Sequence, residues 1–127
     1  MTIMPSVLPV LISTIKAMPE VDDSASDLVG FEQGMVWVRV NQAPGSVLAR
    51  DRLFQPNFDF NIYGPNADSV ESVSRSVMQV VSALKGFHNS SLVITDVDIR
   101  VTPHDFTDWF SGSPRYVFSA AIACRSK

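Results

Sequence analysis

The feature that most constrains the fold is a strand pattern that runs directly into a helix pattern. In the segment NFDFNIY, residues 57–63, large apolar residues alternate with Asp59 and Asn61. A period of two is typical of a strand that buries one face and leaves the other polar. The segment GPN, residues 64–66, then interrupts the alternation. The pattern therefore predicts a half-polar strand over residues 54–63. Because Pro56 lacks an N–H, this strand either lies at the edge of the sheet or begins at Pro56.

After this break, apolar residues recur at helical spacing and predict a second helix. Asn66 or Asp68 suits its N-cap, Glu71 adds negative charge near its start, and Gly86 marks its end. Its expected core stripe comprises Val70, Val73, Val77, Val80, Val81 and Leu84. A second stripe of small residues comprises Ser69, Ser72, Ser76 and Ala83. This second stripe is interpreted as a solvated face, with a flat contact surface for another subunit as the alternative.

The rest of the chain supplies one more helix and three more strands. Leu8, Leu11, Ile12, Ile15 and Met18 follow the spacing of an amphipathic helix over residues 7–18, with Ser6 as N-cap and Pro19 as terminator. The other strands are predicted over residues 35–40, 91–102 and 115–126, with loops over 20–33 and 103–114. In the strand 91–102, Val97, Ile99 and Val101 are expected to face the core.

The resulting order, α-β-β-α-β-β, predicts an α+β fold. Two pairs of strands and two helices suit one mostly antiparallel or mixed sheet with both helices packed on one face. No repeat or linker interrupts the sequence, so residues 1–127 are predicted to form a single domain.

Composition narrows the classes of function. The net charge is −3, which gives no basis for gripping nucleic acid through its phosphates. The only cysteine, Cys124, lies in an apolar strand and is expected to be a reduced core residue. No apolar run approaches the roughly 20 residues of a membrane span, and the N-terminal charge order does not suit a signal peptide. We therefore expect no membrane association.

No motif predicts catalysis, a metal or a cofactor. His88 and His104 lack the short fixed spacing of metal ligands, and no nucleophile elbow or phosphate-binding loop is present. His104, Asp105 and Asp108 have the chemistry to bind a cation, but a polar loop tip is the preferred interpretation. We therefore expect no catalytic, cofactor-binding or metal-binding residue.

Two groups of large apolar residues are candidate contact sites. Met35 and Trp37 share the second face of the strand 35–40 with Arg39, and we expect another element or another subunit to cover them. Phe106, Trp109 and Phe110 lie in the polar loop 103–114. These aromatic residues either fill the chain's own core or anchor a partner.

In order along nearly the whole chain, several segments resemble the tail terminator proteins of long, non-contractile-tailed bacteriophages. The first is an amphipathic helix followed by an acidic loop and the strand MVWVRV. The second is FDFNIYGPNADSVESVSRSVMQVVSAL, and the third is PRYVFSAAIACR, which is similar to the family's closing strand.

This resemblance implies a structural virion protein rather than an enzyme. It implies a homo-oligomer, a hexameric ring in the tail neck, assembled in the host cytoplasm, that stops tube polymerisation. Its expected partners are the tail tube protein and the head-closure connector, and DNA is expected to pass through the lumen without specific binding. The polar face with Asp59 and Asn61 would then contact subunits or line the ring. The alternatives are another neck component, such as a head-closure or tail-completion protein, or a small α+β enzyme or ligand-binding domain.

Overall fold

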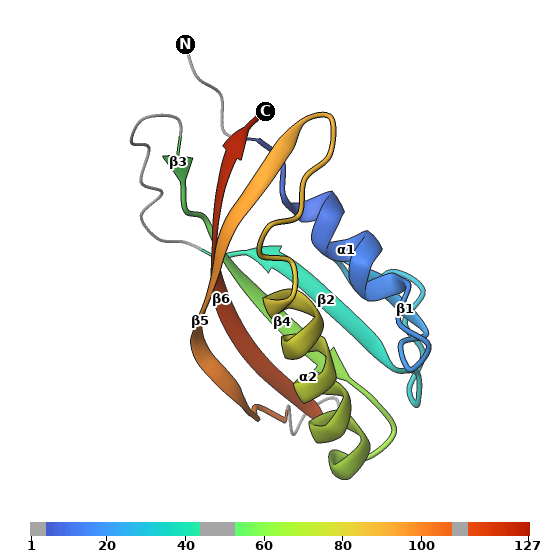
Figure 1. The fold of residues 1–127 in the computed structure, drawn as a ribbon. Coiled ribbons are helices and arrows are strands. Elements are labelled where there is room, and N and C mark those ends of the chain that lie inside the picture. Colours follow the sequence, from blue (N-terminus) through green and yellow to red (C-terminus); the bar gives the residue numbers. More distant parts are fainter. Residues whose placement is uncertain (1–4, 44–52, 108–111) are drawn as a thin grey trace.

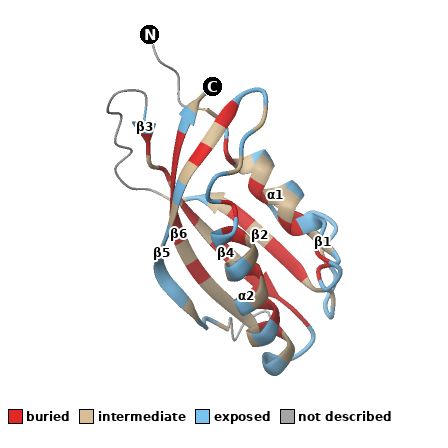
Figure 2. Ribbon diagram, in the orientation of Figure 1, coloured by how far each residue is buried: buried red, intermediate tan, exposed pale blue. Residues whose placement is uncertain are grey.

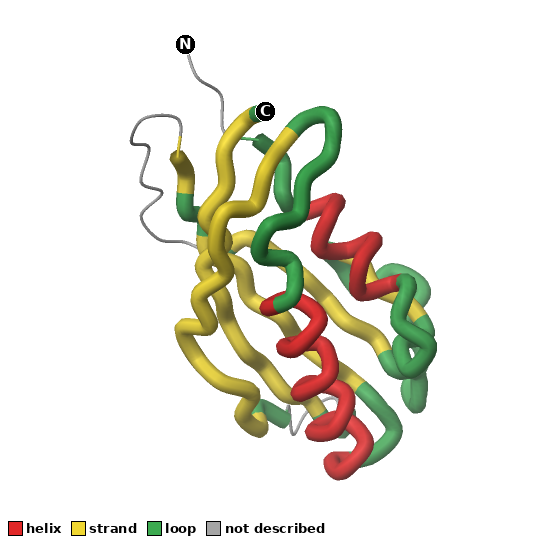
Figure 3. The backbone as a smooth tube through the Cα atoms, in the orientation of Figure 1, coloured by secondary structure: helices red, strands yellow, loops and turns green. Residues whose placement is uncertain are grey.

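The computed structural model describes residues 5–43, 53–107 and 112–127, and it has an α+β architecture (Figure 1). Its two helices are α1 (Leu8–Lys16) and α2 (Ala67–Ser82). Its six strands form one curled, mixed sheet: β1 (Asp23–Ala25), β2 (Trp37–Gln42), β3 (Leu53–Phe54), β4 (Asn57–Tyr63), β5 (Leu92–Asp105) and β6 (Arg115–Ser126). Figure 3 shows the long strands curving past the helices.

The last strand, β6, organises the sheet. It pairs with β4 and β3 along one edge and with β5 along the other, all antiparallel. On the far side of β4, the antiparallel strand β2 is followed by the short parallel strand β1. The predicted antiparallel or mixed sheet is therefore confirmed, with β1 as its one parallel member among the described strands.

The observed element order contains two strands more than the sequence pattern predicted. β1 lies inside the acidic segment 20–33, which was predicted to be a loop. The strand predicted over 54–63 is divided into β3 and β4 around Pro56, whose carbonyl accepts a hydrogen bond from the Ile122 N–H at 3.0 Å. β5 also continues to Asp105, so the first residues of the predicted loop 103–114 belong to a strand.

One hydrophobic core joins both helices to the sheet. Phe60 of β4 stacks on Phe118 of β6 with ring centroids 4.5 Å apart, and Leu11 of α1 and Val77 of α2 are fully buried in the same cluster. α1 contacts β1 and β2, α2 contacts β4, β5 and β6, and the two helices contact each other. Figure 2 shows buried positions along the central strands of the sheet and on both helices.

The helix ends follow local hydrogen bonding. The Asn66 side chain accepts a hydrogen bond from the Ser69 N–H at 2.8 Å, which confirms Asn66 as the cap of α2. α1 instead has Val7 at its N-cap and no side-chain cap, so the expectation for Ser6 was wrong. α2 ends at Ser82, and Gly86 follows in a turn with a φ of 89°.

Candidate interaction surface

The polar side of the sheet is the best-defined candidate site. Opposite residues of paired strands share a face, so the register places Arg39, Asn61 and Val117 in one row across three strands. The next row contains Asn41, Asp59, Ser119 and Val101. The six residues other than Val101 are half-buried, and Val101 is 47% exposed. We call these seven positions, together with Asn57, the open face, which is the half-polar surface of β2, β4, β5 and β6. The open face thus comprises Arg39, Asn41, Asn57, Asp59, Asn61, Val101, Val117 and Ser119.

Val101 reaches this surface through an irregularity in β5. Ile99 pairs with Ala120, but Val101 pairs with Ser119, so Arg100 is an extra residue on the β5 side. Such a bulge reverses the side on which the following residues point. The expectation that Val101 faces the core was therefore wrong, because strict alternation does not survive a bulge.

Arg39 lies in the open face and has no partner for part of its guanidinium group. Its Nε is buried and makes no hydrogen bond in the described part of the chain. Asn61 lies directly opposite on β4 and hydrogen-bonds instead to Asn41 across 3.5 Å. A buried donor without an acceptor is costly and rare in folded proteins. Sequence reasoning grouped Arg39 with Met35 and Trp37 but did not select it, although a cation within MVWVRV was a visible signal.

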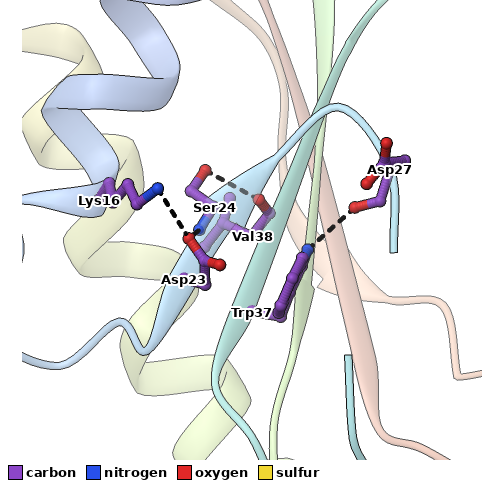
Figure 4. A network of polar contacts seen from close by, with 6 residues as sticks. All are labelled: Lys16, Asp23, Ser24, Asp27, Trp37 and Val38. Carbon is purple, nitrogen blue, oxygen red and sulfur yellow. Dashed lines mark hydrogen bonds and ion pairs between the residues drawn. The ribbon is translucent and has the colours of Figure 1, made fainter. Parts of the chain in front are cut away.

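Trp37 is covered by its own chain. Its indole Nε1 donates to the Asp27 carbonyl at 3.0 Å (Figure 4). Phe31 packs edge-to-face against the Trp37 ring, with the two centroids 6.0 Å apart. Trp37 is consequently 2% exposed. Met35 is half-buried, and its sulfur accepts a hydrogen bond from the Glu32 N–H. The predicted cover over Trp37 thus comes from an element of the same chain, and a second subunit is not needed to supply it.

The acidic segment that provides this cover is held by its own carboxylates. Asp22 accepts a hydrogen bond from the Val36 N–H at 2.8 Å. Asp23 forms an ion pair with Lys16 at 3.3 Å (Figure 4). Asp27 accepts a hydrogen bond from the Val29 N–H. Glu20 and Glu32 are exposed, and neither makes an ion pair or hydrogen bond through its carboxylate in the described chain. These two carboxylates remain available for other contacts.

A cluster of aromatic and cationic side chains lies at one end of the open face. The Arg115 guanidinium stacks on the Phe106 ring, 4.8 Å from its centroid, and donates to the Phe106 carbonyl at 3.0 Å. It also approaches the Tyr63 ring and hydroxyl. Phe106 is nevertheless 56% exposed. Trp109 and Phe110, which the sequence grouped with Phe106, lie outside the described residues.

The two helices border an open groove of about 520 Å³. Its lining includes Met18, Glu20, Ser76, Gln79 and Ala83. Ser76 and Ala83 belong to the small-residue stripe that the sequence analysis singled out, so this stripe forms part of a concave surface. Glu20 contributes a carboxylate to this groove, and the other described residues that line it are uncharged.

The titratable groups show no constellation for metal chemistry. No group of three or more His, Cys, Asp or Glu side chains that suits a metal ion occurs within residues 5–43, 53–107 and 112–127. The His104 ring lies edge-on to the Phe106 ring. The Asp105 carboxylate accepts hydrogen bonds from the Thr107 hydroxyl and backbone N–H, and these two hydrogen bonds lower the pKa of Asp105. Burial raises the pKa of the Cys124 thiol to about 11, so the thiol is protonated at neutral pH.

Neither the protein-family models nor the curated proteins that were searched give a match to this sequence. In the part of the chain that the structure describes, no helix has the length and apolarity needed to cross a bilayer.

Proposed function

We propose that this chain is the tail terminator of a long, non-contractile-tailed bacteriophage. In this proposal, copies of the chain form a closed ring, a hexamer, at the head-proximal end of the tail tube in the neck of the virion. The ring stops addition of further tube protein and presents a docking face to the head-closure connector. The tail terminator resemblance of the sequence motivates the identity, and the surface of the fold supports an assembly role.

The observation that carries the proposal is the composition of the open face and its border. The buried Nε of Arg39 has no acceptor among the described residues, and Phe106, more than half exposed, stacks on the guanidinium of Arg115. Arginine and aromatic residues dominate the energetics of protein interfaces. A surface with an incompletely hydrogen-bonded Arg39 and an exposed Phe106 stacked on Arg115 suits contact with another protein better than contact with water alone.

The proposed ring also assigns roles to the two faces of the sheet and to the charge of the ring's lumen. Both helices would cover the core side of the sheet, leaving the open face for contacts between subunits. Because the chain carries a net charge of −3, a ring built from it would repel the phosphates of DNA in transit. DNA would then pass through the ring without specific binding.

Docking to the tube should depend on Phe106. We expect Phe106→Ala to weaken binding of the chain to tube ends by roughly 2 kcal/mol, as loss of an interface anchor does. The melting temperature of the free chain should change little, because Phe106 is 56% exposed. Val29→Ala, which removes an 81% exposed apolar side chain, is the matched control and should leave binding intact.

The same binding measurement separates the neck roles. The proposal requires that the chain bind tube ends and limit tube length when it is added to polymerising tube protein. Binding to the head connector alone, with no effect on tube length, would favour a head-closure or tail-completion protein. Equal losses for Phe106→Ala and Val29→Ala would remove Phe106 from the docking site.

A further inference from the structure

Two unsatisfied features lie on different parts of this molecule. One is the buried Nε of Arg39 on the open face, which finds no acceptor among the described residues. The other is the groove between α1 and α2, with the free carboxylate of Glu20 in its lining. The open face carries Arg39 in the row next to the carboxylate of Asp59, and Glu20 is the one charged residue among the described lining residues of the groove. Arg39 and Glu20 are therefore a pair of opposite charge on two separate surfaces.

From this complementarity we propose that the open face of one copy docks on the α1–α2 groove of the next copy. In this contact, Arg39 donates to the Glu20 carboxylate of the neighbouring copy. The inference rests on the proposed ring, because a contact between two different surfaces of one chain is the kind that closes into a ring. It assigns to the ring a specific pair of surfaces and a specific ion pair.

Other carboxylates fit this geometry less well. Asp59 lies in the open face itself, so a contact between Arg39 and Asp59 of a second copy requires two open faces to meet in a two-fold dimer. Glu32 belongs to the segment whose Phe31 covers Trp37, beside the open face of its own copy. Glu20 is the free carboxylate that lies on a separate concave surface.

The groove also suits the apolar part of the open face. Met18 and Ala83 give part of its lining an apolar character, and Ser76 adds a small side chain that permits close approach. The open face offers Val101, 47% exposed, and the half-buried Val117 in rows beside and in line with Arg39. Desolvation by these groups would strengthen the Arg39–Glu20 pair, since charges interact more strongly away from water.

Charge reversal tests the ion pair. Arg39→Glu and Glu20→Arg should each raise the concentration at which half of the chains are assembled by at least about tenfold, the scale expected when one partner of a buried pair is lost. The double variant carries the reversed pair at every contact and should recover most of the assembly. Arg125→Glu reverses an exposed arginine at the far end of β6 and should have no effect.

Folding of the variants is checked separately. Melting temperatures of the free chains identify a variant that fails to fold, and Arg39→Gln then replaces Arg39→Glu because it removes the charge without placing a carboxylate beside Asp59. Assembly is measured where the wild-type chain assembles, in solution or on tube ends. Full assembly of folded Arg39→Glu and Arg39→Gln would overturn the ion pair while leaving the proposed function intact. A wild-type chain that stays monomeric in both settings would overturn both.

Disulfide cross-linking tests the pair of surfaces independently. A chain carrying both Asn61→Cys on the open face and Gln79→Cys in the groove should give a ladder of linked copies on oxidation. Chains with only one of these substitutions should stay unlinked. Efficient dimers from Asn61→Cys alone would show that open faces meet each other, which would overturn the proposed docking.

Discussion

Gly64 shows how a single backbone position allows the strand-to-helix passage that dominates this sequence. The residue is buried between β4 and α2, and a Cβ built there would lie 2.7 Å from Cγ2 of Val70. Real Cβ atoms do not approach another heavy atom so closely, so either the helix or the strand must shift when a side chain is added. The glycine is therefore required by close packing at this turn.

This contact makes Gly64→Ala destabilising. We expect the free energy of unfolding to fall by roughly 1–3 kcal/mol, the usual cost of overpacking a core. Denaturant unfolding of the purified chain measures the change. The same substitution in a Val70→Ala background should cost less, because the clashing methyl group is gone. A Gly64→Ala chain as stable as the wild type would show that α2 moves freely relative to β4.

At the scale of elements, α2 depends on its cap and its packing rather than on helix propensity. Valine is a weak helix former, but the buried positions of α2 are mostly valine. Asn66→Ala removes the acceptor for the Ser69 N–H and should cost about 1 kcal/mol of stability. Asn66→Asp keeps an acceptor at the same place and should preserve most of it. If both variants lose equal stability in thermal unfolding, the side-chain cap contributes nothing.

The sequence predicted the elements whose patterns are local. The last strand was predicted over 115–126 and is observed over the same residues. Its pattern is local, because Tyr116, Phe118, Ala120, Ile122 and Cys124 recur at every second position. The cap at Asn66 was likewise readable from a local signal. β1 was missed because it is three residues long and is defined by parallel pairing with β2, which no local pattern encodes. Val101 was misplaced for a related reason, since a bulge arises from pairing with β6.

The candidate site was predictable only in outline. The sequence indicated a polar face at Asp59 and Asn61 and a need for cover at Trp37. It did not indicate that Asp27 and Phe31 supply that cover, since these contacts depend on how the segment 20–33 folds back over β2. The unpaired Nε of Arg39 could not be foreseen either, because a hydrogen-bond deficit is a property of the packed structure.

At the scale of the whole molecule, the proposed function rests on surfaces rather than on reactive groups. The open face, the exposed Phe106 and the groove between the helices are all suited to contacts with protein. A single chain leaves these surfaces partly unsatisfied, and a closed ring with separate faces for neighbours and tube would use them together.

The most direct test is the mass and shape of the assembled protein. Light scattering of the purified chain, with electron microscopy of the chain alone and on purified tail tubes, should reveal a closed ring of six times the 14.0 kDa chain. We expect this ring to form in solution or at one end of each tube. A chain that remains monomeric in solution and leaves tube ends bare would contradict it.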